Sequence, residues 1–317
     1  MGLLTKAVIK IETNSFDKNN AKLWKDMPPI EGIKVTDGLN YTNNKEEKFR
    51  LFNIYEPVDP IDSLPVVIDI HGGGWMYGDR NLNGEFAKYC ASLGTKVLTF
   101  SYRILDKVKL IEMVQDVFEF MHYISKNAAE LHLNLKKCAI VGDSAGGHLT
   151  LLFMAINASK ELQEIYKVEP VDLDVSFICL QHACASLNQT IFGGKGKLLD
   201  IAMNLYRKAL FGRKRKTDKI YLNSSIDQFA KYLKLPKVLA VSATGDDLKK
   251  NNDLMLKVFD ENDIKYEYKE YEGLFHVFQV MKYDLKESKE INSYMIELFK
   301  QSRKLSGNMS TSKSDKK

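Results

Sequence analysis

The sequence has few cysteines, and none of them is spaced for a metal site or an evident disulfide pair. Its 317 residues include Cys90, Cys138, Cys179 and Cys184, without CxxC or paired-histidine spacing. Cys138 and Cys179 fall in short apolar runs that we predict to be buried strands. We therefore expect reduced core thiols and a cytoplasmic location.

Long hydrophobic runs are also missing, which argues against a membrane-spanning chain. No stretch is long and apolar enough to cross a bilayer. The first ten residues are interrupted by Lys6 and Lys10, so they lack the apolar core of a secretion signal. Lys6 also stands where a myristoylation signal needs Ser or Thr. We expect no stable membrane anchor.

No large excess of one charge is present. The net charge is +5, and charged residues make up 27% of the chain. This weak excess gives no reason to expect a nucleic-acid partner. A basic run between Arg207 and Lys219 could bind nucleic acid or anionic lipid, but no recognition motif flanks it, which favours a solvated face. The hydrophobic content of 44% is enough for a large core.

What the sequence does contain is a glycine-rich segment, Gly-Asp-Ser-Ala-Gly-Gly, at residues 142–147. It follows a predicted buried strand at 138–141 and precedes a predicted buried helix from His148. A Gly-x-Ser-x-Gly turn between strand and helix is typical of a nucleophile elbow, whose strained turn lifts the serine hydroxyl above the sheet edge. Alone, the motif fits a Ser-Gly turn that caps an ordinary helix equally well.

Predicted strands and helices alternate from Val66 onward, which indicates a mostly parallel sheet with helices on both faces. Three glycine-bearing loops, 71–75, 142–147 and 245–247, each follow a predicted strand. Because ligands bind at the carboxyl ends of such strands, this placement supports one shared site. Before Val66 we predict only two early strands, and the polar residues up to about 20 give no clear element.

The hydroxyl of Ser144 needs a base before it can act as a nucleophile. His276 follows the last predicted strand, and a loop at that place can reach back over the sheet edge to the elbow. The remaining histidines are expected to be loop, surface or packing residues or weaker candidates: His71, His122, His132, His148 and His182. We therefore favour His276 as the base.

A carboxylate should hold the other ring N–H of that histidine. Asp246 and Asp247 follow the predicted strand that lies between elbow and histidine in the sequence. The resulting order, Ser144…Asp246…His276, is the one associated with the nucleophile elbow. Asp247 stays open as the alternative, because either aspartate can cap the helix that follows.

An oxyanion formed by the attack requires fixed donors. The glycines at 72–74 leave the backbone N–H groups free to approach a ligand, and the amide of Ala145 adds a donor. A flexible loop or a phosphate cradle would look similar, but no lysine follows the glycines as in a P-loop. We expect His71 to fix this loop by hydrogen bonding.

Together these motifs resemble the hormone-sensitive-lipase-like branch of the α/β-hydrolases. The resemblance is carried by 71–75 (His-Gly-Gly-Gly-Trp), 142–147 (Gly-Asp-Ser-Ala-Gly-Gly), 245–248 (Gly-Asp-Asp-Leu), 101–103 (Ser-Tyr-Arg) and the loop of His276. It extends over roughly residues 66–300. It implies a triad of Ser144, Asp246 and His276 and an oxyanion hole of Gly73, Gly74 and Ala145, with His71, Gly72 and Asp143 in support.

The chain departs from the family pattern at two places. Asp247 stands where the family usually has proline, and residues 104–107 replace a proline-rich run. The fold that the resemblance implies is one α/β-hydrolase domain over 1–305, in which 185–235 form a small cap insertion. The polar residues 306–317 are expected to be a disordered tail.

The resemblance implies a serine carboxylesterase for short- to medium-chain acyl esters that needs no metal or cofactor. Trp75 and Tyr77 follow the glycine loop, and we expect them to wall the substrate pocket. An arylformamidase, another amidase or a peptidase on the same fold is an alternative. A ligand-binding protein on a former hydrolase scaffold is the less favoured one. The expected partner is a small-molecule ester, and a homodimer stays open.

Overall fold

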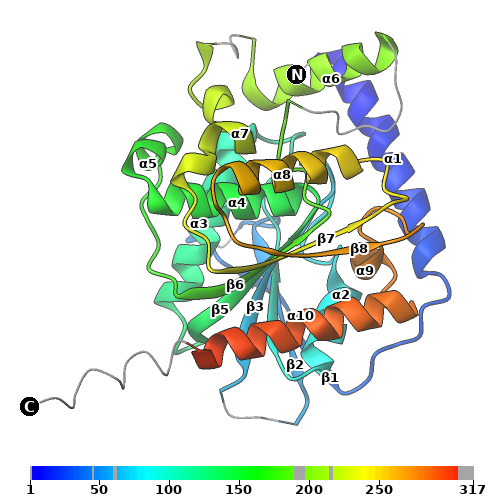
Figure 1. Cartoon of the computed structure of the whole chain (residues 1–317), viewed down its shortest axis with the longest axis vertical. Coiled ribbons are helices and arrows are strands. Elements are labelled where there is room, and N and C mark those ends of the chain that lie inside the picture. Colours follow the sequence, from blue (N-terminus) through cyan, green and yellow to red (C-terminus); the bar gives the residue numbers. More distant parts are fainter. Residues whose placement is uncertain (1, 45, 60–62, 189–196, 214–216, 306–317) are drawn as a thin grey trace, which may run out of the picture.

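The computed structural model describes residues 2–44, 46–59, 63–188, 197–213 and 217–305. Its centre is an eight-stranded sheet of order β1-β2-β4-β3-β5-β6-β7-β8, in which β2 runs antiparallel to β1 and β4 and all other neighbours are parallel (Figure 1). The strands are β1 (Ile33–Asn40), β2 (Leu51–Pro57), β3 (Pro65–Ile70), β4 (Lys96–Phe100), β5 (Asn134–Asp143), β6 (Val175–Gln181), β7 (Lys237–Ala243) and β8 (Glu267–Tyr271). The mostly parallel sheet predicted from the sequence is confirmed.

Helices cover both faces of this sheet (Figure 1). One face carries α3 (Leu110–Lys126), α4 (Ala145–Ala158) and α8 (Lys249–Glu261), and the other carries α2 (Gly84–Ser92), α9 (Phe278–Met281) and α10 (Lys286–Leu305). Successive strand residues point to opposite faces, so Val66 and Ile68 of β3 join the first core cluster and Val67 joins the second. This two-sided burial explains why β3 reads as a nearly continuous apolar run.

The N-terminal segment, which the sequence left unassigned, forms the 22-residue helix α1 (Leu3–Trp24). Its apolar residues do not make one continuous stripe along the helix, so the hydrophobic periodicity of the sequence did not indicate a helix here. Tertiary contacts hold it instead: the Tyr77 hydroxyl donates to Asp17 Oδ1 at 2.8 Å, and the Phe16 and Tyr77 rings lie 5.3 Å apart. Packing has therefore decided the conformation where propensity was weak.

The stretch at 185–235 contributes short helices rather than strands in its described part. These are α6 (Lys197–Phe211), η2 (Tyr221–Asn223), α7 (Ile226–Phe229) and η3 (Ala230–Tyr232), with α5 (Lys160–Tyr166) preceding the stretch. Helix α6 packs beside α1, whereas α7 contacts α4 and α8 (Figure 1). Parts of this stretch and the predicted tail at 306–317 lie outside the described residues.

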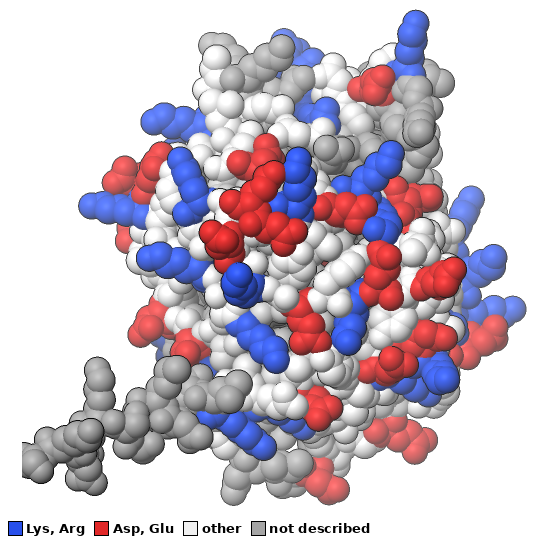
Figure 2. Space-filling model, in the orientation of Figure 1, with Lys and Arg blue, Asp and Glu red and all other residues white. Residues whose placement is uncertain are grey.

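Charged side chains of both signs are interspersed on the face shown in Figure 2, in keeping with the small net charge. Arg207, the first residue of the basic run, makes hydrogen bonds within the protein: its guanidinium donates to the carbonyls of Leu187 and Asn188, each at 2.8 Å. Residues 214–216 of the run lie outside the described part. Within the described residues, no helix combines the length and apolar composition that crossing a membrane requires.

Candidate active site

The turn between β5 and α4 holds Ser144 in a strained backbone conformation. Its φ is 50° and its ψ is −115°, a region that residues other than glycine rarely adopt. The flanking glycines are required by space. A Cβ on Gly142 would lie 2.4 Å from Thr150 Oγ1, and one on Gly146 would lie 1.8 Å from the Ile70 carbonyl oxygen. The close packing of elbow and sheet thus holds the serine in place, as the motif predicted.

Three residues that the sequence placed far apart come together at the carboxyl ends of the strands. Ser144 Oγ lies 2.9 Å from His276 Nε2, and His276 Nδ1 lies 2.8 Å from Asp246 Oδ2. The other oxygen, Oδ1, accepts the Leu248 N–H at 2.7 Å, so one carboxylate both meets the histidine and caps the following turn. Asp247 is exposed, lines the cavity and has no hydrogen bond to a histidine among the described residues.

The protonation state of this chain follows from the carboxylate. Burial alone would raise the pKa of Asp246, but hydrogen bonds from His182 and His276 lower it well below its usual range. An ionised carboxylate only accepts, so His276 carries its proton on Nδ1. Its Nε2 is then free to accept the proton of the Ser144 hydroxyl, which is the arrangement that general-base chemistry needs.

The glycine loop packs directly against the elbow. The Gly72 N–H donates to Asp143 Oδ1 at 2.9 Å, and a Cβ on Gly72 would lie 2.2 Å from Asp143 Oδ2. Gly73 has a φ of +91°, and a Cβ there would lie 2.1 Å from the Tyr77 carbonyl oxygen. Only glycine fits these two positions, so the loop can pack closely against Asp143, the residue before Ser144.

Gly73 and Gly74 line the same cavity as Ser144, and Ala145 follows it, so their backbone amides are the candidate donors for an oxyanion. The carbonyls of Gly73 and Gly74 are engaged elsewhere, by the Met76 N–H at 3.2 Å and the Tyr206 hydroxyl at 2.5 Å. Ala145 opens α4, so its N–H has no partner within the helix and lies at the positive end of the helix dipole. In the described part of the chain, no acceptor is recorded for the amides of these three residues.

A buried network lies behind the glycine loop. The Asn83 side-chain amide donates to Asp143 Oδ1 at 2.8 Å and to Asp69 Oδ2 at 3.0 Å. Burial raises the pKa of Asp143 to about 6, and it raises the pKa of Asp69 well above its usual range. Asn83 therefore bridges two carboxyl groups, one of which binds the glycine loop.

His71 lies within the same layer but not beside the serine hydroxyl. Its Nδ1 lies 2.9 Å from the Gly72 carbonyl oxygen, and its ring stacks on Tyr102 with the centroids 4.3 Å apart. Burial lowers the pKa of His71 to about 4, so the ring is neutral at neutral pH. These contacts fit the expected role of fixing the loop.

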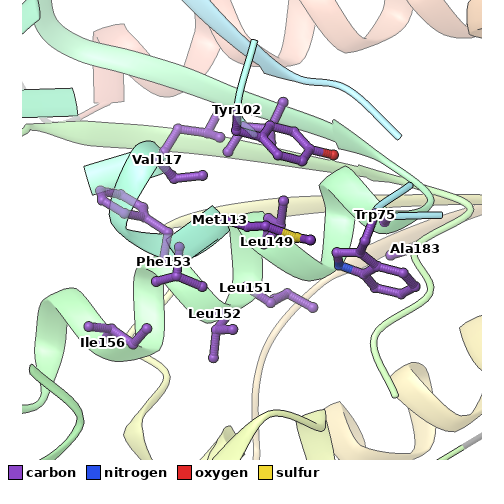
Figure 3. Close-up of a cluster of buried hydrophobic side chains, with 14 of the residues drawn as sticks. Trp75, Tyr102, Met113, Val117, Leu149, Leu151, Leu152, Phe153, Ile156 and Ala183 are labelled. Carbon is purple, nitrogen blue, oxygen red and sulfur yellow. The ribbon is translucent and has the colours of Figure 1, made fainter. Parts of the chain in front are cut away.

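A cavity of about 610 Å³ opens over Ser144 and His276. Tyr77 and Trp75 line it together with residues of α1, among them Phe16 and Leu23. The Trp75 side chain is fully buried among residues of α3 and α4 (Figure 3), and its indole N–H donates to His148 Nδ1 at 3.2 Å. Trp75 therefore belongs to the hydrophobic core as well as to the cavity wall. Truncating it would destabilise the fold by about 3–5 kcal/mol rather than only widen the pocket.

His148 is a packing residue with a fixed tautomer. An indole only donates, so His148 Nδ1 accepts from Trp75 and Nε2–H donates to the Ser224 carbonyl at 2.6 Å. Burial lowers the pKa of His148 from 6.5 to about 4. The folded state thus favours the neutral ring, and the stability this contributes is present above pH 6.5 and is lost as the pH falls toward 4.

His148→Gln retains an acceptor and a donor but does not titrate. By linkage, lowering the pH from 7 to 5 costs wild type about 2 kcal/mol at His148, which the variant does not lose. We expect the difference in unfolding free energy between wild type and variant to shrink by that amount. Urea unfolding of both proteins at the two pH values measures it, and an unchanged difference would contradict a neutral His148 ring in the folded protein.

The sequence analysis treated His182 only as a weaker candidate for the base and did not foresee its contact with Asp246. Its Nδ1 lies 2.7 Å from Asp246 Oδ2, the oxygen that His276 also contacts. Ligand atoms of these three residues lie within 4.8 Å of one another, a spacing that could hold a metal ion, but their mutual hydrogen bonds already account for it. Strand order was the missing signal: β6 lies between β5 and β7, so the residue after β6 faces both the elbow and the acid loop.

Cys184 also lies beside the site. Its Sγ is 3.6 Å from Ser144 Oγ, and burial raises the pKa of the thiol to about 12. The thiol therefore stays protonated and is a poor nucleophile. All four cysteines are buried and free, which confirms the expectation for Cys138 and Cys179.

A family of proteins described by its α/β-hydrolase fold matches residues 67–280. Esterase B from Lactobacillus rhamnosis has 28% sequence identity to this chain and a TM-score of 0.89, covering 97% of this chain and 98% of that one. Carboxylesterase NlhH of Mycobacterium tuberculosis is 31% identical over 98 residues, 31% of each chain. An arylesterase of Saccharolobus solfataricus is 30% identical over 159 residues, 50% of this chain and 49% of that protein. The alignments thus span a third to a half of these two curated relatives, and the family match covers most of the present chain. The chain belongs to the α/β-hydrolase family that its motifs resemble.

Proposed function

We propose that this protein is a serine carboxylesterase that hydrolyses short- to medium-chain acyl esters. The observation that carries the proposal is the continuous hydrogen-bonded chain from Ser144 through His276 to Asp246, at the floor of a cavity. The three amides at Gly73, Gly74 and Ala145 supply the matching donors. The esterase names of the relatives support the same reaction class.

The reaction proceeds in two steps, acylation of Ser144 and hydrolysis of the acyl-enzyme. Ser144 Oγ attacks the ester carbonyl while His276 Nε2 takes its proton, and the oxyanion of the tetrahedral intermediate accepts from the backbone amides. His276 then gives that proton to the leaving alkoxide, and an acyl-enzyme remains. Water, deprotonated by His276, attacks the acyl-enzyme in the same way, which releases the acid and restores the Ser144 hydroxyl. Asp246 holds the imidazole and stabilises its positive charge throughout.

Several substrate classes fit this machinery, and a substrate panel separates them. Purified protein is assayed with p-nitrophenyl esters, an arylformamide and a peptide anilide. We expect kcat/KM for the esters to exceed the others. A clear preference for the formamide or the anilide would instead make the protein an amidase or a peptidase. Binding of the compounds without turnover of any would show a ligand-binding protein.

The cavity predicts a preference for short acyl chains. Each methylene that is buried contributes about 0.8 kcal/mol, and chains longer than the pocket clash or stay in water. We expect kcat/KM to rise from acetyl to about hexanoyl and to fall beyond it, on the same burial argument. Triglyceride emulsions should be poor substrates. The measurement is kcat/KM for p-nitrophenyl esters from acetate to palmitate. A maximum at palmitate would contradict the expected preference for short acyl chains.

Phe16→Ala tests where this pocket ends. Phe16 lines the cavity from α1 with its ring 5.3 Å from that of Tyr77, so its truncation should move the optimum to longer chains. Ile11→Ala is the matched control, because Ile11 lies on the same helix, is 67% exposed and is absent from the cavity wall. An optimum that stays in place in Phe16→Ala, or that moves equally in both variants, would exclude α1 as the wall.

A further inference from the structure

We propose that His182 is a positioning residue that acts on the proposed triad through Asp246. Two imidazoles share one carboxylate oxygen: His182 Nδ1 lies 2.7 Å and His276 Nδ1 lies 2.8 Å from Asp246 Oδ2. The side chain of His182 has no exposed surface, whereas that of His276 is 27% exposed toward the cavity. The proposal rests on the esterase function, because it concerns how the same carboxylate is held and charged.

The backbone places His182 rigidly at this point. Its N–H donates to the Val241 carbonyl at 2.8 Å, directly after β6, and its φ of 52° lies in the left-handed region. Residues other than glycine adopt this conformation infrequently, and the surrounding structure maintains it here. The Phe278 ring meets the His182 ring edge-on at 5.7 Å and so limits its rotation.

The tautomer of His182 follows from the same argument as that of His276. Burial lowers the pKa of His182, so the ring is neutral, and the ionised Asp246 can only accept. His182 therefore carries its proton on Nδ1, and this N–H donates a hydrogen bond to the carboxylate. Oδ2 receives two N–H groups and Oδ1 receives one, from Leu248, which fixes the plane of the carboxylate.

This second donor has a chemical consequence. Part of the negative charge on Oδ2 is compensated by the His182 N–H, so a variant without this donor presents more negative charge to the His276 ring. The other titratable groups that face the cluster from the elbow, the loop after β6 and the loop after β7 are Asp143, Cys184 and Asp247. None of them is changed in the variants below.

Two substitutions separate donation from packing. His182→Asn places an amide N–H near the position of Nδ1 and tolerates the left-handed conformation. His182→Leu keeps the bulk but removes the donor. The measurement is kcat, KM and their pH dependence with p-nitrophenyl butyrate. If the leucine variant does not fold, His182→Gln replaces it, because its amide lies beyond the position of Nδ1.

We expect His182→Leu to lower kcat about 10- to 100-fold with little change in KM, since partners that orient a reacting side chain have effects of this size. The acid limb of its kcat/KM profile should move up by about half to one pH unit, because one charge-assisted hydrogen bond is lost. His182→Asn should stay near wild type in both. A wild-type rate and profile in the leucine variant would overturn the proposal. Equal losses in both variants with unshifted profiles would show a packing role instead.

Proton NMR of the resting protein gives a readout that does not depend on turnover. Two N–H groups bound to one carboxylate should give two downfield imidazole resonances, and His182→Leu should lose one of them. An unchanged downfield spectrum in that variant would contradict the shared oxygen. Failure of the esterase proposal would appear differently, as a wild-type protein that hydrolyses none of the esters while keeping both resonances.

Discussion

Ser144→Ala is expected to reduce kcat for ester hydrolysis about 10⁵- to 10⁶-fold while the protein stays folded. The variant loses the atom that attacks the carbonyl, and no nearby group can replace it: the thiol of Cys184 is protonated, and its pKa is about 12 because of burial. A small residual rate over water should remain from the amide donors. Folding should change little, because alanine meets the same φ of 50° that serine already meets.

A fluorophosphonate probe with thermal unfolding checks this prediction. The probe should label wild type and the control Ser15→Ala, whose serine lines the same cavity from α1, but not Ser144→Ala. Labelling that persists in Ser144→Ala would show that another residue is the nucleophile.

Asp246→Asn should have the second largest effect, a loss of about 10³- to 10⁴-fold in kcat. If the amide nitrogen of the asparagine faces His276, it cannot accept the Nδ1–H. If the amide oxygen faces His276, it accepts that N–H but supplies no negative charge to stabilise the imidazolium. Asp247→Asn should keep kcat within about threefold, since exposed side chains that contact no reacting group contribute little. Asp247 differs from Asp246 in being exposed and in making no hydrogen bond to a histidine within the described part of the chain.

Steady-state kinetics of the two variants at neutral pH measure this contrast. The pair is well matched, because the residues are neighbours and the substitutions are identical. Circular dichroism and thermal unfolding control for lost structure, since Asp246 also caps the turn at Leu248. If Asp247→Asn were the more damaging substitution, Asp247 rather than Asp246 would be the acid of the triad.

The sequence was sufficient for the centre of the sheet, because β3, β4, β6 and β7 are largely buried and carry a strong apolar signal. The loops at 71–75, 142–147 and 245–247 follow β3, β5 and β7, and parallel strands bring them to one edge. Strand limits were less predictable. The strand around Cys179, β6, starts only at Val175, and the preceding Val171 N–H donates instead to Asn157 Oδ1.

Three features of the site depend on tertiary structure and had no local signal. Helix α1 is held by contacts with Tyr77, far along the chain, and its own periodicity is weak. The burial of Trp75 depends on a histidine partner in α4. The place of His182 follows from the order of the strands rather than from any motif around it. In each case the neighbour that decides the conformation is distant in sequence.

The measurement that tests the central claim most directly is the mass of the trapped acyl-enzyme. The protein is mixed with p-nitrophenyl butyrate, quenched in acid within the first turnover, digested and mapped by mass spectrometry. The account predicts one butyryl group on the peptide that contains Ser144, and none on that peptide in Ser144→Ala. Acylation of Cys184 or of another residue, or turnover without any acylated peptide, would contradict it.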